Sequence, residues 1–174
     1  MDDVEAADVL LSAVYRKNDR EVFARMFDVN KKDDRELGPL HYCVAYESIG
    51  CAAALLANGA RSDLSFKGLH PVHMAALMGK SEILRVFLER GGDCDAPDYQ
   101  SNATPIFYAA FAGSIPCVDL LLAKGAFVDA EDRSGLTALL VAGMCENVPM
   151  ISHLLQRSTK PVLSSFDGTV HGKD

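Results

Sequence analysis

The histidines are the first residues of this chain that could perform chemistry, and two of them recur at a regular interval. His41 and His73 lie 32 residues apart. Histidine is a common metal ligand, but a zinc site gathers three or four protein ligands at one point. A single histidine in each interval supplies no such cluster. We therefore interpret both as structural residues of a repeated motif and expect no metal site.

Two further motifs are incomplete. Gly79-Lys80-Ser81 matches the end of a phosphate-binding loop, but Met74 stands where this loop requires its first glycine. The five cysteines form no CxxC pair, and none lies at a spacing from a histidine that would mark a nucleophile. These patterns give no catalytic residue, so we expect neither an enzyme nor a cofactor.

Acidic residues in the predicted turns could suggest a calcium site. Asp63, Asp95 and Asp129 fall one to a unit, at similar repeat positions. Calcium needs six to eight oxygen ligands around one ion, which residues spread over separate units do not provide. We interpret the three aspartates as solvated turn residues.

Composition narrows the class of protein. The chain has 174 residues, 49% of them apolar, and a formal net charge of −7. An acidic chain does not suit the phosphate backbone of nucleic acids, and no apolar run reaches the length of a membrane span. The N-terminus is acidic, unlike a secretory signal, and an odd number of cysteines is typical of a reducing compartment. We expect a cytoplasmic or nuclear protein without direct nucleic-acid binding or membrane insertion.

A short phrase recurs four times in the middle of the chain and sets the spacing of these residues. Its second positions lie 32, 34 and 33 residues apart. A fixed period of this length marks a repeat array, whose units bury their apolar faces only against their neighbours. Such an array offers a binding surface rather than a catalytic pocket. The four copies are Gly38-Pro39-Leu40-His41, His70-Pro71-Val72-His73, Thr104-Pro105-Ile106-Phe107 and Thr137-Ala138-Leu139-Leu140.

The unit from Gly68 to Gly91 predicts a pair of helices. Pro71 suits the first position of a helix, where its missing N–H costs nothing. Gly79 suits a helix end in left-handed conformation, and the outer units carry Glu47 and Glu146 at that position. A second helix is predicted from the apolar spacing of Ile83, Leu84, Phe87 and Leu88.

These phrases resemble the ankyrin-repeat motif, in which a T-P-L-H turn precedes two alanines, a glycine, a second helix and a final Gly-Ala. The second and third units match almost throughout, and the resemblance covers residues 33–158. It implies an all-α ankyrin-repeat solenoid of helix-turn-helix units with short β-hairpin loops. Phe107 and Leu140 replace the turn histidine of the motif, so we expect the third and fourth units to stack less firmly.

The period divides the chain into six segments. An apolar pattern in residues 4–29 predicts a degenerate copy of the repeat that caps the N-terminal end of the array. For the last segment two interpretations stay open: it begins a further repeat of a longer array, which we favour, or its Val162, Leu163 and Phe166 cover the fourth unit. The segments are 1–32, the N-terminal capping repeat; 33–66, 67–99 and 100–132, ankyrin repeats; 133–165, a degenerate ankyrin repeat; and 166–174, a tail or the start of a further repeat.

The resemblance also implies where a partner binds. In ankyrin arrays the hairpin tips and the residues after the two alanines face the concave side, and here those positions are unusually apolar. A contiguous exposed apolar patch commonly marks a binding site; the alternative is that these side chains enlarge the core. The predicted partner-binding residues are Arg35, Leu37, Tyr46, Phe66, Lys67, Leu69, Met78, Gln100, Phe111, Arg133, Leu136 and Met144.

The function implied is non-catalytic binding of a partner protein, through an apolar peptide segment or a helix of that partner. The chain would act as a monomer and as the recognition part of a larger scaffold or regulatory protein. A first alternative is a complete small ankyrin adaptor or inhibitor that masks its partner. A second is an ankyrin domain that recruits substrates for an enzyme. The partner and the pathway do not follow from the resemblance.

Overall fold

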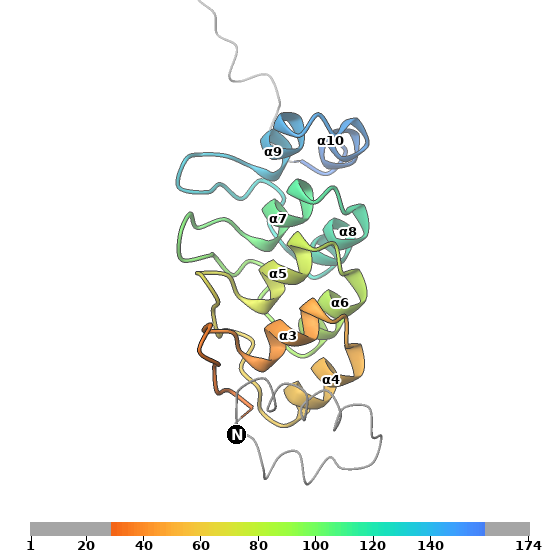
Figure 1. Cartoon of the computed structure of the whole chain (residues 1–174). Coiled ribbons are helices and arrows are strands. Elements are labelled where there is room, and N and C mark those ends of the chain that lie inside the picture. Colours follow the sequence, from red (N-terminus) through yellow and green to blue (C-terminus); the bar gives the residue numbers. More distant parts are fainter. Residues whose placement is uncertain (1–28, 159–174) are drawn as a thin grey trace, which may run out of the picture.

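Eight short helices, stacked in pairs, make up the part of the chain that a computed structural model describes, residues 29–158. The first helices of the pairs form one column and the second helices another, and the connecting loops project to the side of the first column (Figure 1). Each predicted segment between residues 33 and 165 contains one pair. The first helices are α3 (Pro39–Ala45), α5 (Pro71–Leu77), α7 (Pro105–Phe111) and α9 (Ala138–Met144), and the second helices are α4 (Ile49–Ala57), α6 (Ser81–Glu89), α8 (Ile115–Ala123) and α10 (Val148–Leu155).

The first helices have seven residues each, and their limits follow from the motif. Three of them begin with the motif proline, whose fixed φ suits the first helical position. The residue after each helix cap is left-handed: Gly79 has φ 66° and Gly113 has φ 71°, as the glycines predict. Glu47 and Glu146 adopt the same conformation at φ 53°. Because left-handed backbone is strained for residues with a Cβ atom, the outer units end their first helices at a cost in stability.

The second helices have eight or nine residues and tolerate a proline near their start. Pro116 and Pro149 lie in the first turn of α8 and α10, where no intrahelical N–H is required. Asn147 caps α10 through its side chain, which accepts a hydrogen bond from the Met150 N–H at 3.1 Å. The prolines therefore help to place the helix starts instead of breaking the helices.

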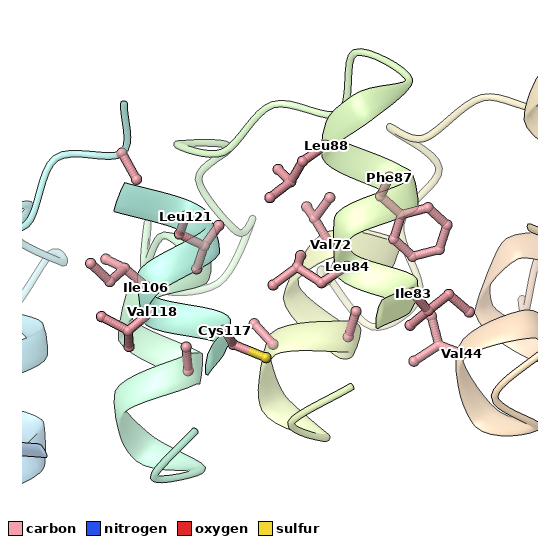
Figure 2. Close-up of a cluster of buried hydrophobic side chains, with 14 of the residues drawn as sticks. Val44, Val72, Ile83, Leu84, Phe87, Leu88, Ile106, Cys117, Val118 and Leu121 are labelled. Atoms are coloured by element: carbon pink, nitrogen blue, oxygen red, sulfur yellow. The ribbon is translucent and has the colours of Figure 1, made fainter. Parts of the chain in front are cut away.

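The core lies between the two columns of helices and runs through all four units. Each first helix packs against the next first helix, and among the second helices α4 packs against α6 and α6 packs against α8. Small residues at the motif alanine positions, such as Ala75, Ala76, Ala109 and Ala110, are fully buried, which lets neighbouring helices approach closely. Figure 2 shows how larger side chains fill the space between layers, among them Phe87, Ile106 and Val118.

The loops between units are built on aspartates and not on paired strands. One carboxylate oxygen of Asp33 accepts hydrogen bonds from the N–H groups of Arg35 and Leu37, at 2.9 and 2.8 Å. Asp132 repeats this arrangement with Ser134 and Leu136. Within residues 29–158 the only β pairing is an isolated bridge between Phe66 and Leu69. The predicted β-hairpin loops are thus tight turns with almost no strand character.

The turn histidines join consecutive units, as their place in the motif predicts. The His70 N–H donates to Nδ1 of His73 at 3.0 Å, so the proton of this ring is on Nε2. Nε2 then donates to the Ala96 carbonyl, in the loop to the next unit, at 2.8 Å. His41 makes the same pair of contacts with Gly38 and with the Leu69 carbonyl. Phe107 and Leu140 offer no such ring nitrogen, and the expected weaker stacking of their units stays a prediction.

The capping repeat and the end of the chain lie outside the described residues. The predicted helices in residues 4–29 fall almost wholly within residues 1–28, and the motif near residues 166–174 falls within residues 159–174.

Candidate functional site

Four large apolar side chains at the ends of the first helices are exposed, one in each unit. Tyr46 is 59% exposed, Met78 42%, Phe111 58% and Met144 72%. Tyr46 and Met78 lie seven residues after the start of their helices, and Phe111 and Met144 lie six, so each unit presents its side chain at the end of its first helix, at one of two adjacent repeat positions. We call these four residues the apolar column. Because they remain open to solvent, they do not enlarge the core.

The predicted tip residues with long polar side chains are also exposed, and some of them link successive loops. Nε2 of Gln100 donates to the Lys67 carbonyl at 2.8 Å, and Nη1 of Arg133 donates to the Gln100 carbonyl at 2.8 Å. The ammonium of Lys67 lies over the Phe66 ring, 5.4 Å from its centre. Arg35 is exposed on the first tip. These contacts connect the second, third and fourth loops into one surface.

The apolar tip residues are half-buried and support the turns. The N–H groups of Leu37 and Leu136 bind the turn aspartates Asp33 and Asp132. Leu69 pairs with Phe66 through two backbone hydrogen bonds of 2.8 and 2.9 Å. The Phe66 ring meets His41 edge-on, with 6.1 Å between the ring centres. Each of these side chains therefore presents only part of its surface to a partner.

An ion pair borders the apolar column. The Lys80 ammonium contacts the Glu47 carboxylate at 2.5 Å, and so connects the turns that follow α3 and α5. Both groups are partly exposed, so the pair contributes little to folding stability. Glu47 follows Tyr46 directly and Lys80 lies two residues after Met78, so the pair brings two charges near the ends of α3 and α5.

Asp98 organises the loop of the third unit, a role that the sequence did not reveal. Its carboxylate accepts hydrogen bonds from the N–H groups of Gln100, Ser101 and Ala103 and from the Tyr108 hydroxyl. Burial acts to raise the pKa of Asp98, but these hydrogen bonds outweigh it and keep the pKa below its usual value. Burial and the bond to Asp98 raise the pKa of Tyr108 to about 12.

A repeated signal in the sequence could have found this arrangement. Tyr42 and Tyr108 each lie three residues after a motif proline, and each follows a turn aspartate. The Tyr42 hydroxyl donates to the Asp33 carboxylate in the same manner as Tyr108 to Asp98. The pairing holds the loops of the first and third units against the first helices of these units.

The turn aspartates considered for calcium bind protein groups. Asp63 forms an ion pair with Arg61 at 2.7 Å, and Asp95 accepts a hydrogen bond from the Phe127 N–H at 3.0 Å. Across residues 29–158, no three histidine, cysteine or acidic side chains gather closely enough to hold a metal ion. No helix in this same part of the chain is both long and apolar enough to pass through a bilayer.

Comparisons with known proteins agree on the kind of repeat. The profile of a family described as Ankyrin repeats (3 copies) matches residues 10–98 and 93–164. The B-cell lymphoma 3 protein homolog of Mus musculus is 34% identical over 122 residues, which cover 67% of this chain and 27% of that protein.

Two other relatives have different printed descriptions. The Nuclear factor NF-kappa-B p105 subunit of Gallus gallus is 33% identical over 146 residues, covering 81% of this chain and 15% of that protein. The Putative palmitoyltransferase ZDHHC13 of Danio rerio is 30% identical over 119 residues, covering 67% of this chain and 18% of that protein. The chain thus spans less than a third of the length of each of the three relatives.

Proposed function

Because the chain belongs to the ankyrin-repeat family, we propose that it binds an apolar segment of a partner protein along the apolar column. Modules of this family generally act in protein–protein interaction and are themselves non-catalytic. The observation that carries the proposal is the exposure of one large apolar side chain per unit at the end of the first helix, at Tyr46, Met78, Phe111 and Met144. Aromatic residues and methionine are enriched where proteins meet.

The hairpin tips complete the proposed surface. Arg35, Lys67, Gln100 and Arg133 are exposed on the loops that precede the first helices, and Leu37, Phe66, Leu69 and Leu136 are partly exposed. Apolar anchors surrounded by polar groups that exclude water are the usual arrangement at the centre of an interface. We assign the energy of binding mainly to the column and its specificity to the tips.

The chain is best suited to be the recognition part of a larger regulatory or scaffold protein in the cytoplasm or nucleus. This choice rests on the small share of each relative that the chain matches. The other roles remain a small adaptor or inhibitor, and a substrate-recruiting domain of an enzyme. The palmitoyltransferase relative, in which a repeat region of this kind accompanies a named enzyme, favours keeping the latter as the second candidate.

A pair of matched substitutions tests the proposal. Phe111→Glu removes an anchor of the column, whereas Phe127→Glu makes the same chemical change at a loop residue that is 72% exposed and lies outside the column. We expect affinity capture from native lysate, read by mass spectrometry, to lose a protein with Phe111→Glu and to keep it with Phe127→Glu. Circular dichroism must show both variants folded. Identical captures from the two variants would place the binding site elsewhere.

A further inference from the structure

Three of the loop tips that project from the stack on one side carry only positive charge (Figure 1). We call residues 66–69, 99–102 and 133–136 the basic tips, because Lys67 and Arg133 are their only charged residues. Both side chains are exposed, and every ion pair within residues 29–158 is formed by other residues. The two cations are therefore available to a partner.

Hydrogen bonds join the basic tips into one surface. Gln100 lies between the two cations: its Nε2 donates to the Lys67 carbonyl at 2.8 Å, and its own carbonyl accepts from Nη1 of Arg133 at 2.8 Å. The Arg133 N–H also donates to the Ser101 carbonyl at 2.8 Å, and the Lys67 ammonium lies 5.4 Å from the centre of the Phe66 ring. Because the Arg133 side chain reaches back to the third tip, the two cations lie about one unit apart, about 8–10 Å.

The carboxylates next to the basic tips are used within the loops. Asp98 is 1% exposed, and its oxygens accept hydrogen bonds from loop N–H groups. Asp132 accepts hydrogen bonds from the N–H groups of Ser134 and Leu136. These acceptors are occupied inside the turns, whereas the ammonium and the remaining N–H groups of the guanidinium stay exposed. The charged groups that a partner meets on these tips are thus donors.

We propose that the basic tips bind acidic residues of the partner segment, with one carboxylate at Lys67 and a second at Arg133. This inference rests on the proposed function, since the same segment would anchor its apolar side chains on the apolar column. A guanidinium matches a carboxylate through parallel N–H groups, and charge complementarity of this kind sets specificity and register.

The first tip gives the partner segment a direction. Residues 34–37 carry Asp34 and Glu36 on either side of Arg35, so this tip is negative as a whole. A like charge facing it would cost binding energy. We therefore expect the acidic residues of the segment over the second, third and fourth units, and not over the first.

The charge of the whole chain makes this preference easy to recognise. With a formal net charge of −7, the chain attracts basic peptides and repels acidic ones at long range. Non-specific attraction would therefore enrich basic peptides in a selection. Enrichment of acidic peptides would have to come from a local positive surface, within a screening length of about 10 Å.

Selection from a random displayed peptide library on the full chain tests the proposal. The variant Lys67→Glu/Arg133→Glu reverses both charges, and glutamate suits the left-handed φ of 49° at position 67, since Glu36 adopts φ 64°. The control Arg90→Glu/Lys124→Glu makes the same changes at exposed residues that cap α6 and α8. We expect peptides selected on the native chain to exceed the library in Asp and Glu. They should bind the tip variant at least about tenfold more weakly and the control within about twofold.

The outcomes separate this inference from the proposed function. Selected peptides without an acidic excess, or with equal affinity for the tip variant and the control, would overturn it. Binding that is lost with Phe111→Glu but kept with the tip variant would also overturn it, and would leave the proposed function standing. Binding that is lost with the tip variant but kept with Phe111→Glu would support the basic tips and contradict the apolar column. Circular dichroism must show that all variants are folded.

Discussion

The Tyr108 hydroxyl donates a hydrogen bond of 2.8 Å to the Asp98 carboxylate, which ties a helix of the third unit to the loop that precedes it. Asp98 is almost fully buried, and every polar group it contacts lies in its own loop or on α7. Within its own unit, the tip that carries Gln100 is therefore organised around a single carboxylate. If the tips contribute to binding, the Asp98 carboxylate supports binding by holding the tip in place, without itself contacting the partner.

Removal of the Asp98 carboxylate is expected to cost much of the stability of the third unit. Asp98→Ala leaves several loop N–H groups without an acceptor, and we expect a loss of about 3 kcal/mol in the free energy of unfolding. Tyr108→Phe removes one bond to a charged acceptor and should cost about 1.5 kcal/mol. Urea denaturation measures both. Tyr99→Phe, at an exposed ring, is the control, and a cost as large as that of Tyr108→Phe would contradict the assignment.

How much of the fold and of the candidate site can be predicted from the sequence depends on the kind of residue. Pro71 and Gly79 fix the limits of a helix through their own backbone restrictions, so the sequence alone located the helix. Asp98 gave no such signal, because a polar residue in a loop is expected to be solvated. Its burial depends on the turn through residues 99–103, which brings the N–H groups of Gln100, Ser101 and Ala103 to it. In the sequence, only the recurrence of a turn aspartate followed by a tyrosine three residues after the motif proline, at Asp33 and Tyr42 and again at Asp98 and Tyr108, indicates this arrangement.

The apolar column shows a second limit of prediction from the sequence. The repeat motif placed Met78 and Phe111 at the ends of the first helices. Because methionine and phenylalanine are both large and apolar, residue type alone did not indicate whether these side chains are buried or exposed. The decision came from the next left-handed residue, Gly79 or Gly113, which ends the helix and turns the chain away.

The buried histidine makes stability depend on pH. Burial lowers the pKa of His73 to about 4, from an ordinary value of 6.5. Below pH 6.5 the unfolded chain binds a proton that the folded chain refuses, so stability present at neutral pH is lost as the pH falls toward 4. We expect a loss of about 2 kcal/mol from this residue between pH 7 and pH 5.

The variant His73→Phe isolates this contribution, because phenylalanine stands naturally at the matching position 107. It should be less stable than the native chain at pH 7, having lost the bond to the Ala96 carbonyl. Since it cannot bind the proton, the difference in unfolding free energy between the two proteins should shrink by about 2 kcal/mol at pH 5. Parallel pH profiles in urea denaturation would contradict the prediction.

The left-handed helix ends predict opposite effects for two substitutions. Glu146→Gly relieves strain at φ 53° and should stabilise the chain by about 0.5–1 kcal/mol. Gly113→Ala introduces strain at φ 71°, and the added Cβ would lie 2.7 Å from Nδ2 of Asn147. Asn147 caps α10, so its displacement should bring the total loss to about 2 kcal/mol. Thermal unfolding compares the two, and changes of the same sign would contradict the argument.

The spacing of the apolar column predicts the form of the partner segment. Helices packed side by side lie about 8–10 Å apart, so successive units present an anchor at about that interval. A partner helix rises about 1.5 Å per residue and returns the same face after seven residues, at about 10.5 Å. An extended strand covers this length in about three residues, but its side chains alternate between faces, so the third residue points away from the column.

We therefore expect peptides selected from a random displayed library of about 22 residues, long enough for three such intervals, to carry apolar residues seven positions apart. The selected peptide should bind Phe111→Glu at least about tenfold more weakly than the native chain, because one large apolar contact is lost. It should bind Phe127→Glu as the native chain does. Selection of proline-rich peptides with apolar residues at every third position would instead indicate a polyproline helix, which advances about 9.3 Å per turn, and would contradict the helical partner.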